Sequence, residues 1–107
     1  MSLSFGLKSS QTQKVKEVLK AHAEIKKAVV FGSRAKDTHR PGSDIDLALF
    51  GAYISHKQIL QLKKDLNDLN LPYKFDPVIY SEISEPALKK HIDRAGEIIL
   101  EQKEKLR

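Results

Sequence analysis

Two aspartates stand at alternate positions of the short apolar stretch SDIDLALF, as Asp44 and Asp46. Residues two apart on a strand point to the same face of a sheet, so we expect both carboxylates to lie side by side. Ile45, Leu47 and Leu49 then take the opposite, core-facing side. Adjacent carboxylates repel each other unless a cation neutralises them, and Mg²⁺ is the hard, oxygen-seeking ion that suits such a pair. The pattern indicates a divalent metal site, although an edge strand with a solvated polar face is the alternative interpretation.

A glycine and a serine, Gly32 and Ser33, follow an apolar segment at residues 28–31 that reads as a buried central strand. At a strand-to-helix turn, backbone N–H groups and a hydroxyl form a cradle for a phosphate. Alone, Gly32 would be only a turn residue. Together with the aspartates downstream, the pair indicates phosphoryl-group chemistry.

The sequence GSRA at Gly32, Ser33 and Arg34, followed by SDIDL from Ser43, resembles the signature of the DNA polymerase β-type nucleotidyltransferase superfamily. Its small prokaryotic minimal nucleotidyltransferases are the most similar group, and this two-part motif is more specific than a lone glycine pattern. The resemblance implies that the nucleotide is contacted by Gly32, Ser33, Arg34 and Ser43. Arg34 fits a solvated first turn of a helix nearly as well. The implied fold is α+β, a small mixed sheet of the polymerase β palm type with helices packed on one side.

The superfamily also holds a third carboxylate on a neighbouring strand, and Asp76 in the apolar segment YKFDPVIY matches it. An aspartate there costs free energy unless a cation or hydrogen bonds compensate. The alternative is a kink at a sheet edge, since Pro77 removes a donor from the strand ladder. The resemblance implies that Asp44, Asp46 and Asp76 bind two Mg²⁺ ions, for which Mn²⁺ could substitute. The implied reaction is transfer of a nucleotidyl group, AMP from ATP, to a hydroxyl.

Helical periodicity predicts the first helix from about Ser10 to Lys27, after a flexible lead-in at residues 1–9. His22 falls on its apolar stripe, where we expect a packed, hydrogen-bonded side chain. Residues 10–107 are expected to form a single nucleotidyltransferase domain.

Two further helices are predicted downstream. The first is capped by Ser55 and reaches about Leu69, and the second starts with Ser84 as its N-cap and ends at Gly96. The IIL segment at residues 98–100 reads either as a final short strand or as a continuation of the last helix.

Composition limits the class of protein. The chain has 107 residues, of which 40% are hydrophobic and 31% charged, as expected for one ordinary soluble domain. It contains no cysteine, no apolar run of membrane-spanning length and no signal-peptide core, so a cytoplasmic location is expected. The net charge of +5 would attract an anionic partner. The lysines are spread over every predicted helix without interleaved aromatics, so direct nucleic-acid binding is not indicated.

No residue of the sequence identifies the acceptor. We expect so short a chain to have no room for an acceptor-binding domain. In the family that the sequence resembles, minimal nucleotidyltransferases pair with helical HEPN-type proteins as antitoxins, and some transfer AMP onto a tyrosine of the toxin. A protein partner in a hetero-oligomer is therefore implied. Three hypotheses remain: a nucleotidyltransferase acting on a protein, a non-catalytic antitoxin that neutralises its partner by docking, and a small nucleic-acid-binding domain.

Overall fold

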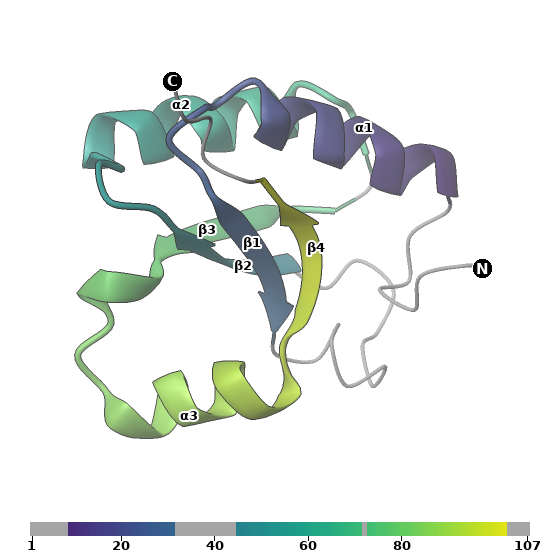
Figure 1. The fold of residues 1–107 in the computed structure, drawn as a ribbon. Coiled ribbons are helices and arrows are strands. Elements are labelled where there is room, and N and C mark those ends of the chain that lie inside the picture. The colour runs from purple at the N-terminus through teal and green to yellow at the C-terminus, as the bar shows by residue number, and fades with distance from the viewer. Residues whose placement is uncertain (1–8, 32–44, 72, 103–107) are drawn as a thin grey trace.

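A computed structural model describes residues 9–31, 45–71 and 73–102. Within these ranges, four strands form one sheet, and three α-helices and a 3₁₀ helix surround it (Figure 1). The elements in chain order are α1 (Ser9–Lys20), β1 (Lys27–Phe31), β2 (Ile45–Phe50), α2 (His56–Asn67), β3 (Phe75–Ile79), η1 (Tyr80–Glu82), α3 (Pro86–Ala95) and β4 (Glu97–Glu101).

The sheet is mixed, with the strand order β3-β2-β1-β4. β1 runs antiparallel to β2 and β4, whereas β2 and β3 are parallel. The prediction of a small mixed sheet with β1 at its centre is confirmed. β2 lies inside the sheet, so the interpretation of its aspartate-bearing segment as an edge strand is wrong. The IIL segment belongs to β4, which decides the alternative in favour of a strand.

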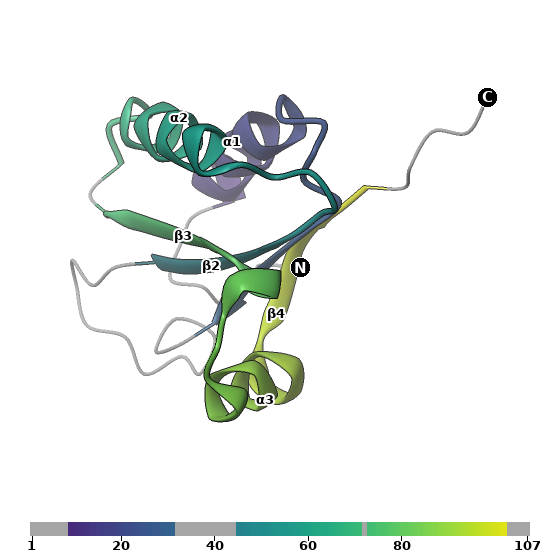
Figure 2. The same cartoon turned by 90° about the vertical axis from the view of Figure 1, so that its left-hand side faces the viewer.

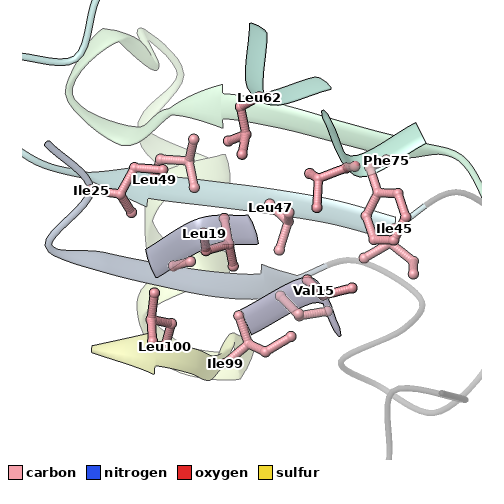
Figure 3. Close-up of a cluster of buried hydrophobic side chains, with 13 residues drawn as sticks. Val15, Leu19, Ile25, Ile45, Leu47, Leu49, Leu62, Phe75, Ile99 and Leu100 are labelled. Atoms are coloured by element: carbon pink, nitrogen blue, oxygen red, sulfur yellow. The ribbon is translucent and has the colours of Figure 1, made fainter. Parts of the chain in front are cut away.

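Alternation along the strands divides the apolar residues between the two faces of the sheet. Ile45, Leu47 and Leu49 point to the face that α1 and α2 cover, as predicted, and all three are buried. Helix positions four apart supply the facing side chains (Figure 3). The main members of this core are Val15 and Leu19 of α1, Leu62 and Leu66 of α2, Phe75 of β3, and Ile99 and Leu100 of β4.

The third helix departs from the expected arrangement. α1 and α2 cover one face, as predicted, but α3 packs below the opposite face (Figure 2). Its Ile92 joins Val29, Phe31 and Ala48, the residues of β1 and β2 that alternate with the main core. The expectation of helices on one side therefore holds for α1 and α2 only, because the alternate residues of β1 and β2 are apolar as well and require their own cover.

The first helix is shorter than predicted. α1 ends at Lys20, where the Ala21 N–H donates to both Glu17 and Val18 and the His22 N–H donates to Leu19, a tightening of the last turn. Ile25 is buried in the main core, and the Lys26 N–H already donates to Phe50 of β2. Entry into the sheet thus ends the helix before its apolar periodicity does.

The predicted helix starts have different outcomes. Ser55 caps α2 in a capping box with Gln58, with distances of 3.2 Å and 2.8 Å for the two reciprocal hydrogen bonds. α3 has Glu85 as its N-cap, so the prediction of Ser84 is wrong, whereas Pro86 does occupy the first turn. A proline restricts the residue before it to extended backbone, which keeps Glu85 out of the helix. Among the described residues, no helix combines the length and the apolar character needed to cross a membrane.

Candidate active site

Three strand ends meet at one edge of the sheet. β1 finishes at Phe31, whereas β2 and β3 begin at Ile45 and Phe75. Because β1 is antiparallel to β2 and β2 is parallel to β3, the end of β1 lies beside the starts of the other two strands. The register makes Phe31 the partner of Asp46, and Asp46 the partner of Asp76. The sheet therefore brings two of the three predicted carboxylates next to each other.

Asp46 and Asp76 project from the same face, the one on which α3 packs, because register partners on adjacent strands point the same way. Neighbouring strands lie about 4.8 Å apart, so the two Cα atoms are close enough for both side chains to reach one small ion. Asp46 is half-buried and Asp76 is exposed. The pair has one carboxylate held inside the sheet and one that solvent or a substrate can reach.

The next row on this face offers no positive charge to the carboxylates. It consists of Val29, Ala48 and Val78, which are register neighbours on β1, β2 and β3. Like charges on adjacent strands destabilise a fold unless a cation or hydrogen bonds offset them. A divalent cation bound at the pair would offset this repulsion.

The donor chemistry fits a hard divalent cation. Two carboxylates supply up to four oxygen atoms, which are the ligands that Mg²⁺ and Mn²⁺ prefer. Within the described ranges, no group of three or more metal-ligating side chains occurs. Asp44 lies outside the described residues, as do the predicted nucleotide-binding residues Gly32, Ser33, Arg34 and Ser43. Their contribution to the site stays a prediction.

A cavity of about 590 Å³ adjoins the exposed carboxylate. It is lined by Asp76 together with Lys63, Asn67, Lys74 and Phe75. The sequence analysis did not identify this cavity or the position of the exposed Lys63 beside the site. Lys63 and Asn67 are four residues apart on α2, and Lys74 lies two residues before Asp76. These spacings place each pair of side chains on one face of its element, and they could have indicated the cavity lining from the sequence.

The far end of the same face is closed by aromatic side chains. Phe50 and Tyr80 stack with their ring centroids 4.3 Å apart, and the Tyr80 hydroxyl donates a 2.9 Å hydrogen bond to Asp93 of α3. That bond raises the pKa of the Tyr80 hydroxyl, because it favours the protonated phenol. Four strand residues, about 13 Å, separate Phe50 from Asp46. Tyr80 therefore helps to fix α3 and takes no part in the carboxylate site.

The predicted role of His22 is confirmed. Its Nε2 lies 3.1 Å from Asp65 Oδ2, and the pair joins the turn after α1 to α2. Gln61 donates a 2.9 Å hydrogen bond to the other oxygen of Asp65. The bonds from Gln61 and His22, in that order of size, lower the pKa of Asp65. Asp65 is half-buried, and its bonds to Gln61 and His22 make the cluster structural.

The family assignment agrees with this geometry. Residues 13–105 match the family described as polymerase beta, nucleotidyltransferase. This chain belongs to that family. The resemblance to its members that was drawn from the GSRA and SDIDL motifs is thereby confirmed.

Curated relatives of this nucleotidyltransferase-family chain come from Methanocaldococcus jannaschii and carry the name protein adenylyltransferase. One is 33% identical over 82 residues, which cover 76% of this chain and 83% of the relative. A second is 34% identical over 82 residues, with the same coverage of both chains.

Solved structures share the fold at lower sequence identity. A chain of a toxin–antitoxin complex with AMP-PNP superposes with a TM-score of 0.72 and 19% identity, covering 86% of this chain and 74% of that chain. A chain of the MntA-HepT toxin–antitoxin complex superposes with a TM-score of 0.68 and 16% identity, covering 89% of this chain and 74% of that chain. A third match is a chain of the complex between the MNT antitoxin and the tri-AMPylated HEPN toxin of Shewanella oneidensis. It superposes with a TM-score of 0.59 and 16% identity, covering 87% of this chain and 71% of that chain. These likenesses confirm the predicted polymerase β-type fold.

Proposed function

We propose that this chain transfers AMP from ATP to a hydroxyl group on a HEPN-type partner protein, in the cytoplasm, with Mg²⁺ as its cofactor. The observation that carries the proposal is the register pair Asp46 and Asp76, two carboxylates on one face where three strand ends meet. Two carboxylates side by side on one face are a set of oxygen donors that suits a divalent cation.

The chain's own residues have separate roles in the proposed reaction. Asp44, Asp46 and Asp76 would hold two Mg²⁺ ions, or Mn²⁺ in their place. When bound, the ions neutralise phosphate charge and lower the pKa of a hydroxyl. Gly32, Ser33, Arg34 and Ser43 would bind the triphosphate. Asp76, exposed on the outermost strand, would orient the acceptor hydroxyl and accept its proton.

The chemistry is one displacement. The acceptor oxygen forms a bond to the α-phosphorus of ATP, the bond to the bridging oxygen breaks, and pyrophosphate leaves. The hydroxyl proton passes to the carboxylate of Asp76. The catalytic gain comes from positioning and from electrostatic stabilisation, and no covalent enzyme intermediate is needed.

The relatives support both substrates in this proposal. The name protein adenylyltransferase, carried by relatives about one third identical, favours ATP as donor and a protein as acceptor. Structural neighbours that are complexes with HEPN toxins favour that class of partner. The competing hypothesis is an antitoxin of the same fold that acts by docking alone.

The test is a transfer assay with ATP labelled at its α-phosphate and Mg²⁺, in which the purified chain is mixed with the protein encoded by the neighbouring gene. We expect label on the partner, loss of label with EDTA, and loss of label in Asp46→Asn and Asp76→Asn. Asp68→Asn serves as the matched control, because Asp68 is an exposed carboxylate at the end of α2, outside the site.

Each result separates the two hypotheses. Label on the partner that requires Asp46 and Asp76 establishes the enzyme. A stable complex that never takes up label, with both carboxylates intact and metal present, establishes the docking antitoxin and refutes the proposal.

A further inference from the structure

Among the described strands, β3 is an outer strand of the sheet, on the side away from β4 and beneath α2 (Figure 2). The Lys74 carbonyl accepts a 2.8 Å hydrogen bond from the Ile45 N–H, so Lys74 directs its backbone groups toward β2. Backbone groups alternate along a strand, and those of Phe75, Pro77 and Ile79 therefore point to the open side. Pro77 has no N–H to donate there. An added strand would meet a gap at the middle of this edge, so recognition here must use side chains.

Two cavities follow one another along this edge. The first, of about 590 Å³, ends at Asp76 and carries Lys63, Asn67 and Lys74. The second, of about 300 Å³, begins at the next residue, Pro77. The residues lining this second cavity are His56, Ile59, Pro77, Val78, Ile79, Glu82 and Ile83. Helix α2 lines both cavities and their β3 residues are consecutive, so we treat them as one surface strip, which we call the β3 groove. Its basic end carries Lys63 and Lys74, and its apolar end is mainly aliphatic, with the His56–Glu82 ion pair at its rim.

The basic end of the β3 groove determines what kind of acceptor fits. Lys63 and Lys74 are exposed ammonium groups that share a cavity with the proposed catalytic carboxylate. They attract an anionic group to a position next to the one where the acceptor hydroxyl must sit. Phe75 is the one aromatic residue among the described residues that line this cavity, and at 1% exposed it gives no stacking platform for a base. This favours a polypeptide with a carboxylate over a nucleic acid.

The apolar end supplies an anchor at a fixed distance. Ile59, Val78 and Ile83 are half-buried and line this cavity. Ile79 lies three residues, about 10 Å, along the strand from Asp76. An extended polypeptide with its acceptor hydroxyl at Asp76 would therefore bring the side chain three residues away to the apolar cavity. Burial of a leucine-sized side chain there would favour binding.

We propose that the β3 groove binds the acceptor segment of the partner protein. An acidic side chain beside the acceptor hydroxyl contacts Lys63 and Lys74, and an apolar side chain three residues away enters the cavity at Ile59 and Ile83. This inference rests on the proposed function, because only that function requires the protein to bind an acceptor. It adds the chemical character of the acceptor segment and the surface that reads it.

The test measures binding without nucleotide, so it does not depend on catalysis. The probe is a fluorescein-labelled heptapeptide, Leu-Ala-Glu-Tyr-Glu-Ala-Leu, followed by fluorescence anisotropy. Lys63→Glu combined with Lys74→Glu should weaken binding by about ten-fold or more, the effect of two modest ion pairs replaced by repulsion. A peptide with lysine in place of glutamate should show the opposite preference. A peptide with serine in place of both leucines should bind the unaltered chain about ten-fold more weakly.

The matched control is Lys57→Glu combined with Lys90→Glu, which changes the net charge equally at exposed lysines that line neither cavity. Binding within about two-fold of the unaltered chain is expected. Equal weakening by both double variants would overturn the groove, because it would show general charge attraction. Stronger, Lys63-dependent binding of a single-stranded oligonucleotide would also overturn it. Groove-dependent peptide binding without any label transfer would support the groove and count against the proposed function alone.

Discussion

Asp46 and Asp76 are direct partners across the parallel β2–β3 ladder, with Asp46 half-buried and Asp76 exposed at the sheet edge. The difference in exposure follows from position, because among the described strands β2 has a neighbour on both sides and β3 has a neighbour on one side. Equal side chains at adjacent sites are thereby suited to unequal roles, one as a fixed ligand and one as the group that meets the acceptor.

Neutralising either carboxylate should separate catalysis from stability. In Asp46→Asn and Asp76→Asn we expect transfer to fall at least about 100-fold, a typical loss for a group that acts on a proton or a metal. The melting temperature without metal should stay equal or rise, because repulsion between like charges is relieved. Kinetics and thermal unfolding of the same preparations measure both effects. Unfolding of either variant would instead make the aspartates structural.

Nucleotide and metal should stabilise the fold together. A ligand that binds only the folded state at one hundred times its Kd adds about 2.7 kcal/mol. For a domain of this size that is a rise in melting temperature on the order of 10 °C. We expect this with ATP and Mg²⁺, a smaller rise with ATP and EDTA, and no metal-dependent part in Asp46→Asn. An unchanged melting temperature at millimolar ATP and Mg²⁺ would count against a nucleotide site.

The sheet and its catalytic edge could be predicted because their signals are local. Alternating apolar residues at Ile45, Leu47 and Leu49 fix which face of β2 turns to the main core, and this leaves Asp46 on the other face. The groove beside Asp76 could not be predicted. It depends on α2 lying over the edge of β3, and no residue of either element specifies that crossing on its own.

Errors at the helix ends have the same cause. The apolar period continues to Ile25, yet α1 stops at Lys20, because Ile25 is buried in the main core at the entry to β1. The position of α3 below the sheet likewise depends on Val29 and Phe31, whose side chains read as part of one uniformly apolar strand until the register is known.

The two candidate capping serines should behave differently. Ser55→Ala removes the side-chain acceptor of a capping box and should destabilise the fold by about 1 kcal/mol. Ser84→Ala changes an exposed residue outside the cap of α3 and should stay within about 0.5 kcal/mol of the unaltered chain. Urea denaturation of both variants under one set of conditions makes the comparison. Equal losses would mean that Ser84 stabilises α3 in a way its position does not explain.

The Asp65 cluster should make stability depend on acid pH. Hydrogen bonds from Gln61 and His22 hold the pKa of Asp65 below its ordinary value of 3.8. Because the folded-state pKa is depressed, this stabilisation is complete above the unfolded-state pKa and disappears as the pH falls through the folded-state value. Asp65→Asn should thus lower the urea midpoint at pH 7, and its difference from the unaltered chain should shrink below about pH 4. Asp68→Asn, on the same helix, is the control and should show no such convergence. A pH-independent difference for Asp65→Asn would assign its effect to packing between α1 and α2 rather than to the ionised carboxylate.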